Sequence, residues 1–341
     1  MIYPNEFPAP SIIKPTGGVP VLYVDPDGVM YRRESTSRLS KSVDQADNWT
    51  EVHTFASPPG KVAKVAAGNL VVFLENGEIW RSDTDGANFA KVFETDSEAS
   101  GIQNLEQYGN MMFCTSWGLP PNVRRNVAIS KDYGATWAYV TPLPETTMNH
   151  THAICYDPYE GLLWAACGDT PNGRRVYWSD NLGVTWQTNP NISHRLTCIM
   201  PFPDKVIFGS DEQYEAFTLE YNRVARGTSG TEIQLEKNWV PIKWINENFE
   251  STWAMRPAVV YGNSPMAYFG FRQAAGATFI PTVWQTDGKD YFPLWKHDHI
   301  PAAGVVPAGI LGVWGPDKDN KIYAALATDI GGVNNHIVII G

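Results

Sequence analysis

The sequence predicts an all-β protein built from many short strands, and three observations support this. First, 29 glycines and 25 prolines are spread along the 341 residues, as expected for frequent turns. Second, the chain has 13 Trp, 15 Tyr and 14 Phe residues, which favour strands. Third, a motif recurs and ends in an aromatic residue at positions 49, 89, 137 and 186, with spacings of 40, 48 and 49. A period near 45 in a β-rich chain is typical of a propeller with one four-stranded blade per repeat.

The order of the predicted elements follows from this repeat. Residues 1–18 are Pro-rich and are predicted to form an extended arm. Residues 19–341 are predicted to form a single propeller, interrupted by an insertion at about 223–251 that fits no blade. Seven blades are predicted, with six as the alternative, at 19–55, 62–95, 101–143, 150–190, 194–222, 252–296 and 302–341. The apolar run HIVIIG at the end of the chain is placed to close the ring against the N-terminal region.

The recurring motif resembles a known structural turn. Its best copies are KDYGATW, preceded by Ser130, and DNLGVTW, preceded by Ser179. Both resemble the Asp-box, or BNR repeat, the Ser-x-Asp-x-Gly-x-Thr-Trp turn of sialidase-like and related propellers. The matching residues in the three clearest copies are Ser82, Gly86, Ser130, Asp132, Gly134, Thr136, Trp137, Ser179, Gly183, Thr185 and Trp186. Asn181 replaces the aspartate in the fourth blade, and Ala46 replaces the glycine in a fourth, weaker copy at 42–49.

The resemblance implies a structural role for these residues. In such a turn the carboxylate accepts hydrogen bonds from backbone N–H groups, and glycine supplies a positive φ. The indole packs between neighbouring sheets. The motif joins the third and fourth strands of a blade, away from the face that carries the active site in the resembling families. We therefore expect Trp137 and Trp186 to be buried at equivalent positions.

A second group of residues forms the candidate binding rim. Consecutive strands of a blade are antiparallel, so alternate loops lie at the same end of the sheet. The loops that enter a blade, or join its second and third strands, lie opposite the Asp-box turns. The polar and aromatic residues in these loops of the third to fifth blades are Trp117, Arg124, Arg125, His150, His152, Asp169, Arg174, Arg175, His194 and Arg195. They are the candidate binding site, and the alternative is that the arginines brace loops.

The sequence offers no catalytic constellation. The sialidase resemblance would require an Arg-Ile-Pro-like motif before the first Asp-box, and Arg32, Arg33 and Arg38 are not followed by x-Pro. A glycosidase needs two close carboxylates, and Asp169 has no evident partner. Neither a phosphate-binding loop nor a triad signature is found. We predict no catalytic residues, no cofactor and no metal, because no carboxylate partner accompanies the pair His150 and His152.

Charge and cysteine content limit the environment. The formal net charge of −10 argues against nucleic-acid binding. No apolar run reaches the roughly 20 residues of a membrane helix, and the first residues do not resemble a signal peptide. Cys114, Cys155, Cys167 and Cys198 lack metal-type spacing and are predicted to be buried, reduced thiols.

The function predicted from the resemblance is that of a non-catalytic binding module. Asp-box propellers resemble modules of bacteriophage tails, baseplates and fibres. This implies a virion protein, synthesised in the cytoplasm without a signal peptide and exposed after lysis. Its expected partners are neighbouring virion proteins and host-surface glycan. One alternative is a glycoside hydrolase or lyase that acts on capsule or cell-wall polysaccharide, and the other is a cytosolic assembly-factor propeller.

Overall fold

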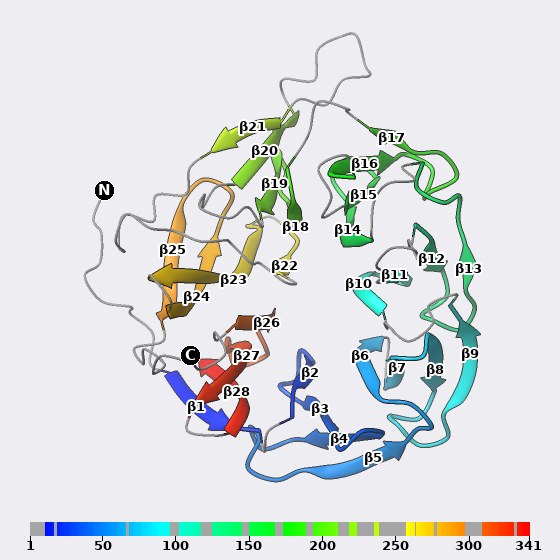
Figure 1. The fold of residues 1–341 in the computed structure, drawn as a ribbon, viewed down its shortest axis with the longest axis vertical. Helices are drawn as coiled ribbons and strands as arrows, with labels where there is room; N and C mark the ends of the chain where they lie inside the picture. The colour runs from blue at the N-terminus through cyan, green and yellow to red at the C-terminus, as the bar shows by residue number, and fades with distance from the viewer. Residues whose placement is uncertain are drawn as a thin grey trace. The chain divides into compact units, whose positions relative to one another are not determined.

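The chain folds as a seven-bladed β-propeller (Figure 1). The structure is a computed structural model that describes residues 11–16, 19–65, 68–95, 102–116, 125–144, 150–167, 173–188, 194–210, 218–223, 235–238, 257–262, 264–275, 278–296, 309–330 and 333–341. These residues form seven antiparallel sheets of four strands each and contain no α-helix. The predicted fold class and the count of seven blades are confirmed, and the alternative of six blades is wrong.

The first four blades take their strands in sequential order. The first blade contains β2 (Val21–Val24), β3 (Met30–Glu34), β4 (Arg38–Ser42) and β5 (Thr50–Thr54). The second contains β6 (Pro59–Val65), β7 (Asn69–Leu74), β8 (Glu78–Ser82) and β9 (Ala90–Glu94). The third contains β10 (Ile102–Tyr108), β11 (Met111–Ser116), β12 (Val127–Ser130) and β13 (Ala138–Tyr139). The fourth contains β14 (Thr151–Asp157), β15 (Leu162–Cys167), β16 (Arg175–Ser179) and β17 (Gln187–Thr188).

The remaining blades include two segments that the sequence placed elsewhere. The fifth blade contains β18 (Leu196–Pro201), β19 (Lys205–Ser210), β20 (Thr218–Asn222) and β21 (Leu235–Asn238), so part of the predicted insertion at 223–251 is its fourth strand. The sixth contains β22 (Ala258–Val260), β23 (Met266–Ala275), β24 (Thr278–Thr286) and β25 (Tyr291–Lys296). The seventh contains β26 (Gly309–Trp314), β27 (Ile322–Ile330), β28 (Val333–Ile340) and, as its outer strand, β1 (Ser11–Pro15). Part of the predicted arm at 1–18 is therefore a blade strand, and it pairs with the apolar run at the end of the chain.

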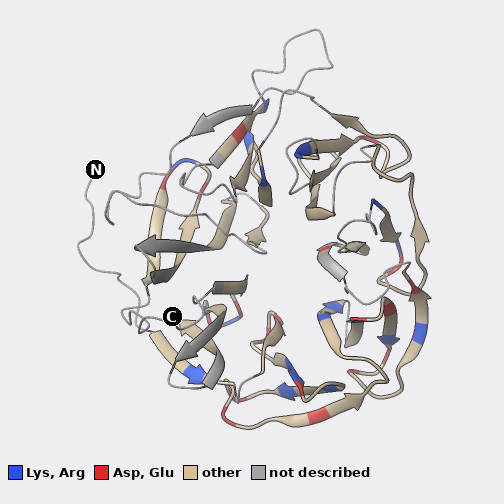
Figure 2. Cartoon of the chain, in the orientation of Figure 1, with Lys and Arg blue, Asp and Glu red and all other residues tan. Residues whose placement is uncertain are grey.

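The outer strands β5, β9, β13, β17 and β1 are more exposed than the strands inside them. The central strand β15 has the sequence LLWAAC and is buried along its whole length. A continuous apolar run is expected for a strand that is covered on both faces. The outer strands β5 and β9 carry Thr, Glu and Lys, and most of their side chains are exposed. Charged residues lie on these outer strands and at strand ends (Figure 2), so the core lies between the faces of neighbouring blades.

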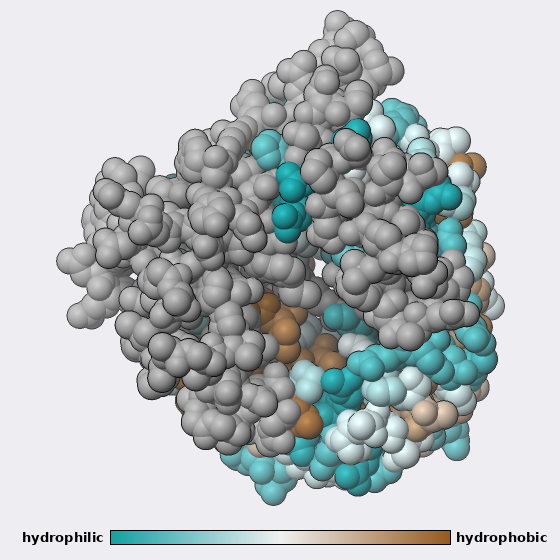
Figure 3. Space-filling view, viewed as in Figure 1, coloured by the Kyte–Doolittle hydropathy of each residue, from teal (hydrophilic) through white to brown (hydrophobic). Residues whose placement is uncertain are grey.

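Packing between adjacent blades is visible in the core cluster of the second and third blades. Val71 and Phe73 of β7 pack with Met112 and Cys114 of β11 and with Trp137. The Phe73 and Trp137 rings meet edge to face, with their centroids 5.6 Å apart. On the molecular face shown in Figure 3, the described surface over the first two blades is mainly hydrophilic. No helix in the described residues is long and apolar enough to span a membrane.

The chain divides into two compact units. One contains residues 1–30, 43–48 and 200–341, and the other contains residues 31–42 and 49–199. The described part of the candidate rim lies wholly in the second unit, and the blade completed by β1 lies in the first.

Candidate functional site

The strand register of the fourth blade places several rim residues together. Thr151, at the start of β14, pairs with Cys167, at the end of β15, and Cys167 pairs with Arg175, at the start of β16. His150, His152, Arg174 and Arg175 therefore lie at one end of this sheet. Ser179 ends β16, so the turn that follows it lies at the opposite end. This is the arrangement expected from the alternation of loops.

Two buried histidines connect this end of the fourth blade to the fifth. His150 is 4% exposed and His152 is 8% exposed. Their ring centroids lie 4.9 Å apart. His152 Nδ1 lies 3.2 Å from the carbonyl oxygen of Leu196, the first residue of β18. His194 and Arg195 directly precede Leu196 and are half-buried, so the contact brings them next to the histidine pair.

The rim arginines also hold loops in place. Arg125 Nη1 donates to the carbonyl oxygen of Leu143 at 3.1 Å, and the Leu143 backbone N–H donates to the carbonyl oxygen of Arg125 at 3.1 Å. Arg175 Nη1 donates to the carbonyl oxygen of Arg174 at 2.7 Å. The bracing alternative thus has direct structural support for Arg125 and Arg175. A guanidinium group has five N–H donors, so an arginine that braces a loop retains the chemistry to bind a carboxylate.

Three of the predicted rim residues, Trp117, Arg124 and Asp169, lie outside the described residues. Within the described part of the chain, no three His, Cys, Asp or Glu side chains are arranged to hold a metal ion. The described rim therefore consists of His150, His152, Arg125, Arg174, Arg175, His194 and Arg195. It combines cationic and imidazole groups at or near the beginnings of strands in the third, fourth and fifth blades.

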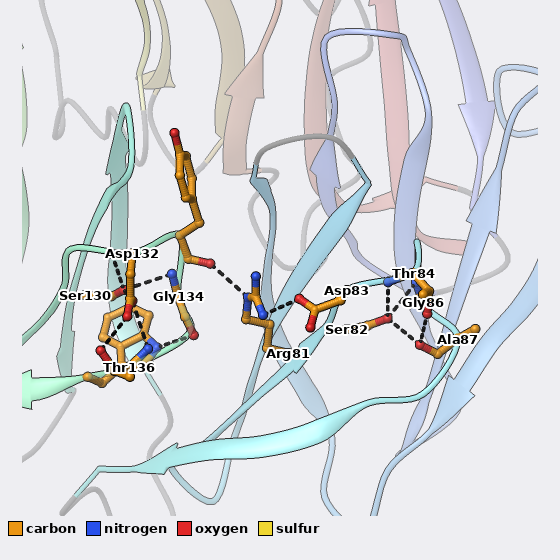
Figure 4. Close-up of polar contacts among 12 residues, drawn as sticks. Arg81, Ser82, Asp83, Thr84, Gly86, Ala87, Ser130, Asp132, Gly134 and Thr136 are labelled. Atoms are coloured by element: carbon orange, nitrogen blue, oxygen red, sulfur yellow. Dashed lines mark hydrogen bonds and ion pairs between the residues drawn. The ribbon is translucent and has the colours of Figure 1, made fainter.

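The third-blade turn has a closed hydrogen-bond network (Figure 4). Ser130 Oγ donates to Asp132 Oδ1 at 2.8 Å and accepts from the Gly134 backbone N–H at 2.8 Å. Asp132 accepts from the Thr136 backbone N–H at 2.8 Å and from the Thr136 hydroxyl at 2.6 Å. Trp137 Nε1 donates to the carbonyl oxygen of Gly134 at 3.0 Å. The side chains of Ser130, Asp132, Thr136 and Trp137 thus all form hydrogen bonds within the turn.

Asp132 is ionised more easily than an ordinary aspartate. Desolvation is the largest single influence on its pKa and raises it. The hydrogen bonds from Thr136, Ser130 and the Ala135 backbone together outweigh desolvation, so the pKa lies below its usual value.

The same turn persists in the fourth blade without a carboxylate. Asn181 Oδ1 accepts from the Thr185 backbone N–H at 2.9 Å and from the Ser179 hydroxyl at 2.9 Å. Its Nδ2 donates to Thr185 Oγ1 at 2.8 Å. In the second blade, the Ser82 hydroxyl accepts from the Gly86 backbone N–H at 3.1 Å. In all three turns, therefore, the serine hydroxyl accepts a hydrogen bond from the backbone N–H of the glycine.

These turns also connect each blade to the preceding one, a role that the sequence analysis did not assign. Lys41 Nζ lies 2.8 Å from Asp85 Oδ2 in the second-blade turn. Arg81 Nε donates to the carbonyl oxygen of Tyr133 in the third-blade turn at 3.1 Å (Figure 4). The Thr141 backbone N–H donates to the carbonyl oxygen of Gly183 at 3.1 Å. The sequence held a signal for these contacts between blades, because Lys41 and Arg81 both directly precede the serine of the turn in their own blade.

The two tryptophans of the motif differ in burial. Trp137 is 9% exposed and lies between the second and third blades. Trp186 is only half-buried, and its Nε1 donates to the carbonyl oxygen of Thr141 at 2.8 Å. The expectation of equivalent burial is therefore wrong for Trp186. Its indole lies against the short outer-strand region of the third blade, which leaves part of the ring exposed.

A second kind of turn went unnoticed in the sequence. Asp25, Asp157 and Asp317 lie at or shortly after the end of the first strand of a blade, and each accepts backbone N–H groups of the turn there. The Tyr323 hydroxyl also donates to Asp317 at 2.5 Å. The dipeptide Asp-Pro in VDPDG and YDPYE was the available signal for two of them. These three buried carboxylates therefore stabilise turns.

Comparison with known proteins identifies the fold alone. No protein-family model matches this sequence, and no curated protein matches it. The propeller YCF48 from Cyanidioschyzon merolae superposes with a TM-score of 0.60 at 9% identity, over 96% of this chain and 98% of that chain. The structure of YCF48 bound to D1 peptide gives 0.60 at 11% identity, over 99% and 96%. The WD40 propeller domain of Doa1 gives 0.58 at 10% identity, over 95% and 97%. This chain therefore shares its architecture with seven-bladed propellers of several kinds.

Proposed function

We propose that this propeller is a non-catalytic protein-interaction module, and that the rim at the starts of the fourth and fifth blades binds an acidic segment of a partner protein. The observation that supports this most directly is the placement of Arg174 and Arg175 at the same end of the fourth blade as the buried pair His150 and His152, with His194 and Arg195 directly before the residue that His152 contacts. The whole chain carries a formal net charge of −10. A local group of cations in an acidic protein favours a partner of negative charge.

The architecture suits such a role. YCF48, which has a similar fold, has been seen bound to the D1 peptide. A propeller presents rigid strand ends and leaves the loops between them to contact a ligand. The half-buried state of the rim arginines also suits binding, because partial burial weakens the screening of charge by solvent.

Peptide binding to a charge-matched set of variants tests the proposal. The probe is a fluorescent peptide rich in Glu and Asp, compared with the same peptide carrying Gln and Asn. Replacing Arg174 and Arg175 with alanine is expected to weaken binding of the acidic peptide. The effect should be larger at low salt, where charges are less screened. The control variant replaces Lys91 and Lys131 with alanine, since both are exposed and lie outside the rim.

The outcomes separate binding from bracing. Equal binding by the two double variants, with a lower unfolding midpoint only for the rim variant, would show that these arginines merely brace loops. A second outcome would also contradict the proposal. In it, the rim variant binds the Gln- and Asn-containing peptide as tightly as the wild-type protein binds the acidic peptide.

For the biological setting we propose a virion, in which the module contacts neighbouring virion proteins and host-surface glycan. This rests on the resemblance of the third- and fourth-blade turns to Asp-boxes and is independent of the rim argument. Mass spectrometry of purified particles would detect the chain in stoichiometric amount. Its absence from particles, together with stable association with a cytosolic complex, would favour the assembly-factor alternative. Turnover of a capsule or cell-wall polysaccharide by the purified protein would favour the enzyme alternative.

A further inference from the structure

The outer strand of the seventh blade is held differently from the strand beneath it. β1 pairs with β28 in antiparallel register from Ser11 with Ile340 to Pro15 with His336. Residues 336–340 of β28 are buried, at 8% exposure or less. In contrast, Ile12 is 52% exposed and Ile13 is 42% exposed. β1 thus completes the backbone ladder of the blade but buries little of its own apolar surface.

Side-chain anchors of β1 are few among the described contacts. Lys14 Nζ forms an ion pair with Asp47 Oδ1 at 2.6 Å, and the Asp47 side chain is 64% exposed. An exposed ion pair of this kind contributes little to stability and is screened by salt. Strands with exposed side chains and few buried contacts open more readily than the core of a fold. β1 is therefore the segment of this blade most easily released.

The connection that follows β1 determines where the strand can pair. Only residues 16–20 separate β1 from β2, and the middle of that stretch is Gly17-Gly18. The Thr16 hydroxyl donates to the carbonyl oxygen of Val19 at 2.5 Å, which ties the two ends of the connection together. A short connection holds β1 close to β28 of the same chain, at an effective concentration on the order of millimolar. A connection too short to span the distance between the two strands reduces this effective concentration to near zero.

We infer that the outer edge of β28 is an interaction surface for a strand supplied in trans, and that its partner is β1 of a second copy of this chain. The exchanged strand makes the same ladder and the same Lys14–Asp47 ion pair, now between two molecules. Such an exchange needs no new contact, so its extent depends on the connection and on protein concentration. This inference is independent of the function proposed for the rim.

Deleting Gly17 and Gly18 tests the inference, because Thr16 then directly precedes Val19 and the connection between β1 and β2 is shorter by two residues. Light scattering after size-exclusion chromatography should show a doubling of molar mass for the deletion variant. Insertion of two additional glycines at the same place should leave the protein monomeric. A folded deletion variant that remains monomeric would overturn the inference.

Cross-linking distinguishes strand exchange from any other dimer. Unlabelled and ¹⁵N-labelled deletion variant are mixed, unfolded and refolded together, and treated with a carbodiimide that joins amines to carboxylates in contact. Exchange predicts Lys14–Asp47 peptides in which one half is labelled and the other is not, in about half of the product. The Lys41–Asp85 pair, at 2.8 Å, is the internal control and should carry one isotope only. A dimer that yields only single-isotope Lys14–Asp47 products, with no mixed ones, would refute the exchange.

Hydrogen exchange on the wild-type monomer tests the inference without a variant. The amides of residues 11–14 should exchange at least about tenfold faster than those of β27, because release of β1 opens only the ladder between β1 and β28. Equal protection of β1 and β27 would contradict the inference even if the deletion variant failed to fold.

Discussion

At the scale of single residues, the four turns of the first four blades share one backbone conformation. Each has two consecutive residues with positive φ, at 45–46, 85–86, 133–134 and 182–183. Glycine occupies the second of these positions in three blades, at φ values of 95°, 77° and 84°. In the first blade the same position is Ala46, at φ 71°. A left-handed conformation strains alanine but not glycine.

We expect Ala46→Gly to stabilise the protein by about 0.5–1 kcal/mol, because the strain removed exceeds the additional freedom of the unfolded chain. Urea unfolding at neutral pH measures the change. Gly134→Ala is the matched opposite, since a Cβ there would lie 2.6 Å from Val71 Cγ2. A lower unfolding midpoint for Ala46→Gly would contradict the argument from backbone strain.

Asp132 and Asn181 form a natural comparison, because they accept the same hydrogen bonds in neighbouring blades. The pKa of Asp132 is lowered in the folded state. Its ionised form therefore stabilises the fold at neutral pH, and this contribution is lost as the pH falls below about 4. Asp132→Asn should remain folded at pH 7 and lose less stability than wild type on acidification. Asn181→Asp should lose more. Urea midpoints at neutral and acidic pH measure both, and parallel pH profiles for the three proteins would contradict the assignment.

Sequence patterns predicted the residues of these turns well, but they did not predict the contacts of the turns with the preceding blade. The Ser, Gly and Thr positions follow from a local repeat, since the hydrogen bonds that they make span only four residues. The contacts from Lys41 and Arg81 to the next blade join residues more than 40 positions apart. No local pattern specifies such partners, although a basic residue before the serine recurs in two blades.

At the scale of elements, the blades differ in how firmly the indole of the turn joins them. Trp137 is buried against Phe73 of the preceding blade, whereas Trp186 is half-buried. Trp137→Ala should lower the free energy of unfolding by about 3–5 kcal/mol, as expected for truncation of a large buried aromatic side chain. Trp186→Ala should cost clearly less, because less apolar area is withdrawn from water. Chemical denaturation of both variants measures the difference. A larger loss for Trp186→Ala would show that burial does not rank these two sites.

Element boundaries were predictable where turn residues and apolar runs alternate, as in the fourth blade. They were not predictable where pairing is distant. β1 is five residues long, contains a proline at its end and pairs with residues at the far end of the chain. β21 likewise lies outside any repeat, and its strand character depends on β20. The rim was predictable by topology alone, whereas the bracing bonds of Arg125 and Arg175 required coordinates.

At the scale of the whole molecule, the cysteines report on the integrity of the core. Cys114, Cys155, Cys167 and Cys198 are all free and buried. Cys155 pairs with Trp164 and Cys167 pairs with Thr151, so these two thiols lie at opposite ends of their hairpin and cannot bridge. Burial raises the pKa of Cys114 above its ordinary value, and it raises that of Cys167 to about 12.

We expect the native protein to react very slowly with a thiol reagent at mildly alkaline pH, because all four thiols are buried and the raised pKa values of Cys114 and Cys167 leave almost no thiolate at those two positions. Denaturation should make all four thiols accessible to the reagent at the same time. The reaction rate in increasing urea should therefore follow the global unfolding transition recorded by tryptophan fluorescence. Rapid modification of any cysteine in the folded protein would show that its blade opens independently.

The pairing of β1 with β28 has a consequence for biosynthesis. β1 leaves the ribosome before all the other described strands, and its partner β28 is made on the order of 300 residues later. At about 5–20 residues per second, the wait between them is on the order of tens of seconds. During that time Ile12 and Ile13 have no ladder to join, while the intervening blades fold behind them. The seventh blade can therefore form only after β28 has left the ribosome, and a chaperone that shields the nascent β1 segment would improve the yield of native protein.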